Sequence, residues 1–187
     1  MDQPLKLNLG CGKNVLQGYI NVDKFGEPEL KHDLECFPWP WPDNSVEEIV
    51  LNHVLEHLGA TTDSYFNIIR EIYRICQTDA TVHIAVPHPR HDDFINDPTH
   101  IRTVTPDSMG LFSKRMNQQW IDGGYANSPL ALYLDVDFEI SDVKQILDPA
   151  WSKKLQDNQV SQSDLAHAAR TYNNVVREYR MTLTVKK

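Results

Sequence analysis

Two glycines and a downstream aspartate are the residues whose types and spacing first indicate chemistry. Gly10 and Gly12 flank Cys11 directly after LKLNL at residues 5–9, whose alternating leucines are typical of a strand. Two glycines around a small residue allow a tight turn and let a ligand come close to backbone N–H groups. Asp23 ends the next apolar run, YINV, and a carboxylate at a strand end can accept two hydrogen bonds from a ribose diol. Residues 5–23 therefore predict half of a nucleoside-binding site.

The spacing of the glycines separates two families of nucleotide-binding domain. A dinucleotide-binding turn requires G-x-G-x-x-G, and Val15 stands at the position of the third glycine. The run LNLGCG, with VD closing the next strand, instead resembles the class I S-adenosylmethionine-dependent methyltransferases, in particular small methyltransferase-11-like domains. The resemblance continues in order through HDL at 32–34, PDNS at 42–45, NHVLEHL at 52–58, REIYRI at 70–75 and VHIAVPH at 82–88. It covers residues 5–88 well, and DPTH at 97–100 and the C-terminal strand are similar to small members of the superfamily.

The resemblance implies an α/β fold: a Rossmann-like, seven-stranded, mostly parallel sheet with a reversed last strand. One domain over residues 1–187 is expected, and within it residues 87–116 form a lid or substrate region. Only six residues separate Gly12 from Tyr19, which is too few for a full crossover helix. The first helix of the fold is therefore expected to be shortened or replaced by an irregular loop.

S-adenosyl-L-methionine is the cofactor that the resemblance implies. Asp33 matches the position at which relatives place an acid against the adenine amino group, although an acid in a plain turn explains it too. Asn8 stands where many relatives carry an acid, so a neutral oxygen or a water is expected to hold the amino group of the ligand. The residues expected to bind the cofactor are Asn8, Gly10, Cys11, Gly12, Asp23, Asp33, Leu34, Asn52 and His53.

Histidines are the candidate catalytic residues. Methyl transfer relies on alignment, and it requires a base only if the acceptor carries a proton. The ordinary pKa of histidine, about 6.5, suits that task. His53 follows the fourth predicted strand at the crevice edge of the sheet and ranks first. His88 ranks second and His100, on the lid, third; the alternative is that His53 only packs on the cofactor. Glu56 and His57, one turn further on, are expected to be structural.

Three functions remain open from the sequence. The leading one is a methyltransferase that acts on a hydroxyl or a nitrogen of a small molecule. The alternative is a non-catalytic, methyltransferase-like binding or partner module. The third is a metal-dependent enzyme that uses the histidines and aspartates between residues 88 and 100. Their spacing matches no zinc or facial-triad motif, and no metal ligand is assigned.

Composition limits the partners. The chain carries 18 basic and 26 acidic residues, a net charge of −8, which makes nucleic acid a poor partner. Its three cysteines are widely spaced, which is typical of reduced thiols in a cytoplasmic protein. The start Met1-Asp2-Gln3-Pro4 lacks the basic and apolar regions of a signal peptide, and no run is long enough to span a membrane. The sequence does not indicate an oligomeric state.

Spacing and capping residues predict the remaining elements. Apolar residues recur at helical spacing from Tyr65 to Cys76, followed by a turn at residues 78–80. Thr105 and Pro106 are expected to begin a helix that runs to about Met116, with a loop at 120–125. Further expectations are a strand at 136–140, a polar, mobile segment at 149–159, a short helix at 165–172 and a long last strand at 175–185.

Prolines and tryptophans alternate in CFPWPWP at residues 36–42. Proline spacing of this kind favours an extended path. One interpretation is a rigid connector whose indoles pack on the domain. The other is that Trp39 or Trp41 covers the adenine or borders the substrate entrance.

Overall fold

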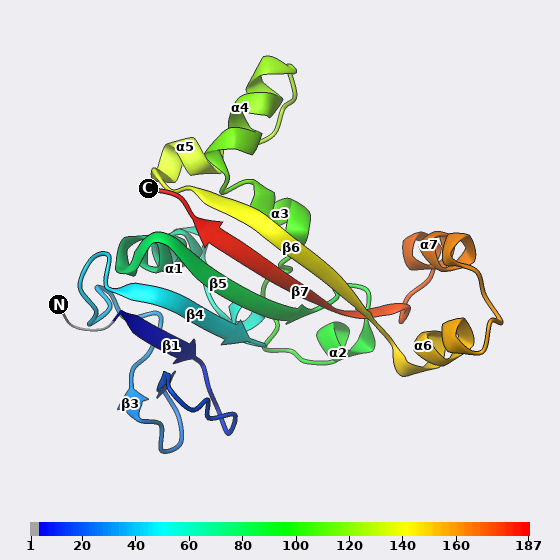
Figure 1. Ribbon diagram of the computed structural model, residues 1–187, viewed down its shortest axis with the longest axis horizontal. Helices are drawn as coiled ribbons and strands as arrows, with labels where there is room; N and C mark the ends of the chain where they lie inside the picture. Colours follow the sequence, from blue (N-terminus) through cyan, green and yellow to red (C-terminus); the bar gives the residue numbers. More distant parts are fainter. Residues whose placement is uncertain (1–3) are drawn as a thin grey trace.

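Seven strands form one mixed sheet in the computed structural model, which describes residues 4–187 (Figure 1). The strands are β1 (Leu5–Leu9), β2 (Ile20–Asp23), β3 (Leu30–Lys31), β4 (Val46–Asn52), β5 (Cys76–Pro87), β6 (Phe138–Leu147) and β7 (Val176–Val185). Their order across the sheet is β3-β2-β1-β4-β5-β7-β6. Neighbours from β3 to β5 pair in parallel, whereas β7 runs antiparallel to both β5 and β6. The predicted α/β fold, a mostly parallel seven-stranded sheet with a reversed last strand, is confirmed.

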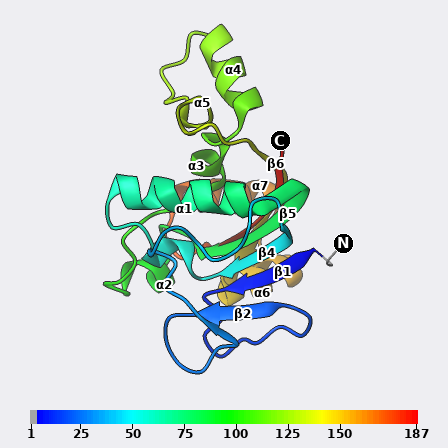
Figure 2. The ribbon, with the colours of Figure 1, turned by 90° about the vertical axis from the view of Figure 1, so that its left-hand side faces the viewer.

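The longest helix of the described chain, α1 (Thr62–Ile75), covers one face of the sheet (Figure 2). The opposite face of β1, β4 and β5 carries no helix from residues 4–187. The shorter helical segments are η1 (Leu55–His57), α2 (Asp92–Ile95), α3 (Pro106–Gly110), α4 (Lys114–Asp122), α5 (Leu130–Leu134), α6 (Pro149–Gln156) and α7 (Gln162–Thr171). None of these described helices is both long and apolar enough to cross a membrane. Met1, Asp2 and Gln3, on which the expectation of no signal peptide partly rests, lie outside the described residues.

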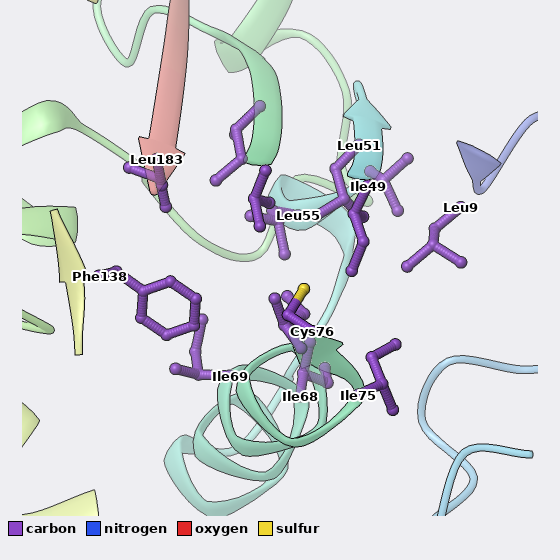
Figure 3. Packing of buried hydrophobic residues seen from close by; sticks show 14 of the residues in the cluster. Leu9, Ile49, Leu51, Leu55, Ile68, Ile69, Ile75, Cys76, Phe138 and Leu183 are labelled. Atoms are coloured by element: carbon purple, nitrogen blue, oxygen red, sulfur yellow. The ribbon is translucent and has the colours of Figure 1, made fainter. Parts of the chain in front are cut away.

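The core lies between α1 and the sheet, as the helical spacing of its apolar residues predicts. The hydroxyl of Thr61 caps the helix by accepting the N–H of Ser64 at 3.2 Å. Ile68, Ile69 and Ile75 of α1 are buried against β4 and η1 (Figure 3). Cys76 was expected on the helix, but it already belongs to β5. η1 and α1 follow β4 directly in the chain, so their packing on the sheet positions the carboxyl end of β4, where the site lies.

An irregular loop replaces the helix expected between β1 and β2. The side-chain amide of Asn8 donates to the carbonyl of Asn14 at 2.7 Å and to Oδ1 of Asn21 at 2.8 Å. The same Oδ1 accepts the N–H of Leu16 at 2.8 Å. Two buried asparagines thus satisfy the backbone groups that a helix would have paired internally. The expectation that the first helix is shortened or replaced by an irregular loop is confirmed, because the described chain has no helix between β1 and β2, and this leaves one face of the sheet uncovered.

The helix expected from residue 105 to about residue 116 is broken in the structure. α3 begins at Pro106 with Thr105 as its cap, as predicted, but it ends at Gly110. A new helix, α4, begins after Ser113, whose hydroxyl accepts the N–H of Met116 at 3.1 Å. Glycine is a weak helix former and serine a strong N-cap, so the sequence stops one helix and starts another. The loop expected at 120–125 is wrong for its first residues, because α4 runs to Asp122.

Two further expectations about local structure are wrong. Residues 149–159 were expected to be polar and mobile, yet α6 spans Pro149–Gln156. Oδ1 of Asp148 accepts the N–H of Ala150 at 2.8 Å, so an N-cap and a proline at the first position start the helix. The turn expected at 78–80 is an irregularity within the continuous strand β5, where Asp79 has a φ of +62°. Aspartate tolerates this left-handed conformation better than most residues.

The CFPWPWP segment is a packed connector. Trp39 and Trp41 are both buried, and Nε1 of Trp39 donates to the carbonyl of Leu34 at 3.1 Å. Glu71 and Arg74 of α1 bind the same segment: Glu71 accepts the N–H of Trp39 at 2.6 Å, and Arg74 donates to the Trp41 carbonyl at 3.0 Å. The interpretation that the indoles pack on the domain is therefore confirmed.

Candidate functional site

A cavity of about 400 Å³ opens where β1, β2 and β4 end. Parallel strands direct their carboxyl ends to one edge, and ligands of open α/β sheets bind at that edge. The residues that line the cavity come from the glycine turn, the ends of β2 and β3, η1 and the segment after α2. They are Gly10, Asp23, Lys24, Phe25, His32, Asp33, Leu34, His53, Val54, His57, Leu58 and Thr99.

The glycine turn is held in a conformation that excludes side chains. Gly10 and Gly12 have φ values of +66° and +51°, a region that L-residues with side chains rarely adopt. A Cβ at Gly10 would lie 2.5 Å from Cγ2 of Val54, so the turn packs directly on the start of the β4–η1 connection. The N–H of Gly12 donates to Oδ2 of Asp23 at 2.8 Å. The turn and the acid at the end of β2 therefore form one rigid unit.

The far end of the cavity has the groups expected around a nucleoside. Asp23 accepts the N–H groups of Gly12 and Phe25, one on each oxygen at 2.8 Å, and it also lines the cavity, where each oxygen can accept a further hydrogen bond. Asp33 accepts the N–H of Glu35 at 3.0 Å and lies 3.5 Å from Nζ of Lys24. Phe25 is 71% exposed although it borders the cavity, which leaves its ring free to cover a flat ligand.

His53 occupies a strained position at the end of β4. Its φ is +56°, and its N–H donates to the carbonyl of Ala85 at 2.8 Å. Its imidazole lies between two carboxylates: Nδ1 is 3.3 Å from Oε1 of Glu56, and Nε2 is 2.7 Å from Oε2 of Glu178. A left-handed non-glycine residue at a crevice marks a position that the surrounding structure enforces.

The charges around His53 favour its protonated form. Glu56 first and then Glu178 raise the pKa of His53 above its ordinary value, although partial burial acts against them. The pKa of the Glu178 carboxyl lies below its ordinary value. Burial acts to raise this pKa, but hydrogen bonds from Arg180 and His53 lower it. The imidazole side chain is 44% exposed, so an incoming ligand can reach it.

The residues expected to bind the cofactor fall into three groups. Five line the cavity described above: Gly10, Asp23, Asp33, Leu34 and His53. Three others line a second hollow of about 510 Å³ on the uncovered side of the sheet: Asn8, Cys11 and Asn52. Gly12 lines neither of these two cavities and acts through its bond to Asp23. The side-chain N–H groups of Asn8 already donate to the carbonyl of Asn14 in the loop and to Oδ1 of Asn21 in β2.

The three candidate catalytic histidines are not brought together. His88 is buried with its ring 4.9 Å from that of Tyr179, and its Nδ1 accepts the N–H of Arg90 at 3.1 Å. Burial first, and then neighbouring positive charge, lower the pKa of His88. It does not line the cavity. His100 instead lies beside His57, with the two ring centroids 4.6 Å apart.

The histidine and aspartate cluster between residues 88 and 100 is dispersed by the fold. Nε2 of His91 lies 3.4 Å from Oδ2 of Asp148, and Asp93 accepts a bond from Arg177 at 2.7 Å. These contacts fasten the segment to the beginnings of α6 and β7. Of the cluster, only His100 belongs to a group of three ligand-type residues in the described chain, together with Glu56 and His57.

Several residues that line the cavity have features in the sequence that could identify them. Phe25 is an exposed aromatic two positions after the predicted ribose acid. Thr99 belongs to the quoted DPTH stretch but was given no role. His57 and Leu58 lie in the quoted NHVLEHL stretch, where only the first two residues were assigned to the cofactor. The proximity of Thr99 and His57 could not be read from spacing, because it depends on how the segment after α2 returns to η1.

No protein-family model matches the chain, and no curated protein matches it in sequence. Its fold does match solved structures. A SAM-dependent methyltransferase from Archaeoglobus fulgidus aligns with 97% of this chain and 86% of its own, at 19% identity and a TM-score of 0.61. The 1,6-didemethyltoxoflavin-N1-methyltransferase of Burkholderia thailandensis, solved with 1,6-didemethyltoxoflavin and S-adenosylhomocysteine, aligns over 98% and 72% at 12% identity and a TM-score of 0.54.

A SAM-dependent methyltransferase of Thermotoga maritima, described as a possible histamine N-methyltransferase, aligns over all of this chain and 84% of its own. Its identity is 12% and its TM-score 0.53. At such identities the similarity concerns the fold. Strand order, the reversed strand β7 and these alignments agree. The chain has the fold of the class I S-adenosylmethionine-dependent methyltransferases.

Proposed function

We propose that the protein is an S-adenosylmethionine-dependent methyltransferase that acts on a hydroxyl or a nitrogen of a small molecule. The observation that carries the proposal is the rigid unit of glycine turn and strand-end acid beside an open cavity. Gly12 and Asp23 are joined at 2.8 Å, and Gly10 leaves no room for a side chain beside Val54. Such a turn accepts a ligand against backbone while the acid holds a ribose diol.

The proposed orientation of the cofactor follows the lining of the cavity. The ribose lies at Asp23, and the adenine lies between Asp33, Leu34 and the exposed ring of Phe25. The methionine part then extends past Gly10 toward His53. This orientation directs the methyl group toward the edge where β4 and β5 end. An acceptor held there can attack the methyl group in line with the carbon–sulfur bond that breaks.

His53 is the proposed acceptor of the substrate proton. An acceptor hydroxyl or N–H that displaces Glu178 from Nε2 would remove one of the two carboxylates that favour the protonated imidazole, so that a neutral Nε2 can face the acceptor while Glu56 remains beside Nδ1. A carboxylate on the far nitrogen stabilises the imidazolium that forms as the proton moves. His88 is a weaker candidate, because it is buried against Tyr179 and away from the cavity. Of the proposed lid, residues 87–116, Thr99 lines the cavity, whereas α3 near the end of that range packs on β6.

Charge and cysteines are consistent with a small acceptor and a cytoplasmic setting. The net charge of −8 gives phosphate polymers little attraction. Cys11, Cys36 and Cys76 are free thiols, two of them buried. The glycine turn and the acid favour cofactor binding, and a methyl-transfer assay separates the methyltransferase from a non-catalytic module that binds the same cofactor.

Calorimetry with S-adenosylhomocysteine tests the proposal. The wild-type chain should bind it, and Asp23→Ala should weaken binding by about tenfold or more, since a hydrogen bond to a charged group is worth roughly 1.5–3 kcal/mol. The matched control is Asp122→Ala, which removes an exposed carboxylate on the distant helix α4. Tight binding of NAD without binding of S-adenosylhomocysteine would refute the proposal.

A further inference from the structure

We infer that Glu56, His57 and His100 form a binding site for one divalent transition-metal ion at the end of the cofactor cavity. A carboxylate oxygen of Glu56 and one ring nitrogen from each histidine lie within 4.8 Å of one another. His57 also lines the cavity, so the group faces the space in which the ligand is proposed to lie. The site goes beyond the proposed methyl transfer and does not depend on it.

The carboxylate of Glu56 is the strongest reason for a cation. The residue has no exposed surface, and neither of its carboxylate oxygens has a hydrogen-bond partner within residues 4–187. Nδ1 of His53 forms an ion pair with Oε1 at 3.3 Å, whereas Oε2 has neither an ion-pair nor a hydrogen-bond partner within residues 4–187. Buried carboxylates are normally paired, hydrogen-bonded or bound to metal. A cation beside the two neighbouring imidazoles would complete the surroundings of Glu56.

Both imidazoles are oriented as metal ligands are. Nδ1 of His100 lies 2.9 Å from the carbonyl of Phe94, which can only accept, so Nδ1 carries the proton. Nδ1 of His57 lies 3.0 Å from Oγ1 of Thr99, whose own proton goes to Asp97 at 2.6 Å. Thr99 therefore accepts from His57. Each ring is left with Nε2 as its possible ligand atom, and Nε2 of His100 also lies 3.7 Å from Oδ2 of Asp97. Metal-binding histidines are typically fixed in this way by a carbonyl or carboxylate on the other nitrogen.

The backbone fixes the three residues relative to one another. Glu56 and His57 are adjacent in η1, and the carbonyl of Glu56 accepts the N–H groups of Ile101 and Arg102, at 2.9 and 3.2 Å. These bonds attach the two residues that follow His100 to η1. A site whose ligands come from rigidly joined segments needs little reorganisation to bind an ion.

The donor set selects the class of ion. Two imidazole nitrogens with one carboxylate oxygen suit Zn²⁺, Mn²⁺, Fe²⁺ or Co²⁺ better than Mg²⁺ or Ca²⁺, which prefer oxygen. Three protein ligands leave at least one coordination position open. Because His57 and Thr99 border the cavity, a ligand in the cavity could reach such a position.

Metal titration of the chelator-treated full chain is the experiment. Wild type should bind one equivalent of Zn²⁺ or Co²⁺ by calorimetry, with a visible absorption band for the cobalt form. Glu56→Gln and His100→Asn should each weaken binding by more than about 100-fold, because even outer partners of a ligand cost 10–100-fold. Thr99→Val, which removes the partner of His57, should weaken it by about 10–100-fold. The control His167→Asn alters a histidine on α7 and should bind as wild type.

Thermal unfolding separates loss of the site from loss of the fold. Glu56→Gln keeps the shape of the side chain but loses the ion pair with His53, so a cooperative melting transition of the metal-free variant is the check that it is folded. Zn²⁺ should raise the melting temperature of wild type and leave that of Glu56→Gln unchanged. Absence of Zn²⁺, Mn²⁺ and Co²⁺ binding to the wild-type chain, or equal binding by folded Glu56→Gln and His100→Asn, overturns the inference. Binding of S-adenosylhomocysteine in the presence of chelator reports on the proposed function separately.

Discussion

Nε2 of His53 lies 2.7 Å from Oε2 of Glu178, although 125 positions separate the two residues in the chain. His53 ends β4 and Glu178 lies near the start of β7, and β5 runs between these two strands. The contact therefore spans the crevice edge of the sheet at the point where the strand direction reverses. It holds the imidazole between the end of β4 and the start of β7.

The first prediction concerns His53. His53→Asn should lower turnover by about 10²-fold or more and leave the affinity for S-adenosylhomocysteine unchanged, because general-base catalysis contributes on that scale. The measurement is single-turnover methyl transfer with an acceptor found by screening small hydroxyl and amine compounds. His83→Asn is a suitable control, since His83 lies on the uncovered face of the sheet, where it bonds Thr182 at 3.3 Å. Turnover near wild type in His53→Asn would remove His53 from the mechanism.

A second prediction compares the two glycines of the turn. Alanine at Gly12 meets no atom within 4 Å, so it should cost only the left-handed backbone, about 1–2 kcal/mol. Alanine at Gly10 also meets Val54 at 2.5 Å and should cost a further 1–3 kcal/mol or so through overpacking. Urea unfolding measures both. Adding Val54→Ala to Gly10→Ala should recover part of the difference, and the interaction energy of that double-mutant cycle isolates the contact. Equal losses for both glycines would contradict the close packing.

Glu71 gives a prediction about stability and pH. It accepts the N–H of Trp39 and two bonds from Arg74, and the bonds from Arg74 are the main reason that its pKa lies below the ordinary value. A lowered pKa in the folded state means that the stabilisation is present above about 4.3, the ordinary pKa of glutamate, and is lost as pH falls through the lower folded value.

Glu71→Gln should therefore lower the free energy of unfolding by roughly 1.5–3 kcal/mol at pH 7. Its deficit relative to wild type should shrink as pH falls below about 4. Urea unfolding between pH 7 and pH 3 measures both values. Glu27→Gln, at an exposed glutamate in the β2–β3 connection, is the control. A deficit that stays constant over this pH range would show that the carboxylate charge of Glu71 does not matter.

The last prediction concerns the proposed lid. Residues 88–95 are held by Arg90, which donates to the carbonyls of Ala169 and Arg170, and by the pair of Asp93 and Arg177. Hydrogen exchange should show strong protection there with and without ligand. Residues 96–100 are exposed or half-buried and should gain protection when S-adenosylhomocysteine and an acceptor bind. Equal protection of residues 96–100 in both states would identify the segment as a fixed loop.

Local sequence patterns were sufficient to predict the elements whose residue spacing specifies them directly. Alternating leucines before Gly10, and an acid closing the next strand, specify β1, the turn and β2 within 19 residues, 5–23. The spacing of the apolar residues in α1 predicts which face of the helix is buried. Asp148 and Pro149 also carried a helix-start signal, but the polarity of the segment obscured it. For α6, the N-cap and the proline were therefore present in the local sequence, and the expectation of a mobile segment was wrong.

The rest of the site depends on long-range contacts that no spacing encodes. His53 and His88 both follow buried strands, yet one ring faces Glu178 and the other turns to Tyr179. His57 and His100 meet only because the carbonyl of Glu56 binds the chain after residue 100. The expectation that Glu56 was merely structural came from its place one turn into a short helix. Its complete burial without a hydrogen bond is visible only in three dimensions.

The sheet face that no helix covers has a consequence for how the chain can vary. On that face Glu48 pairs with Lys6 at 2.9 Å and with Tyr19 at 2.6 Å, so water and neighbouring charges replace a packed layer. Ile49 and Leu51, on the same strand, point into the core. In a library of all single substitutions, tolerance along β4 should therefore alternate residue by residue, with changes accepted at 48 and 50 and rejected at 49 and 51. A three-layer relative would reject changes at all four positions, so this chain is freer to diverge in sequence while it keeps the same crevice.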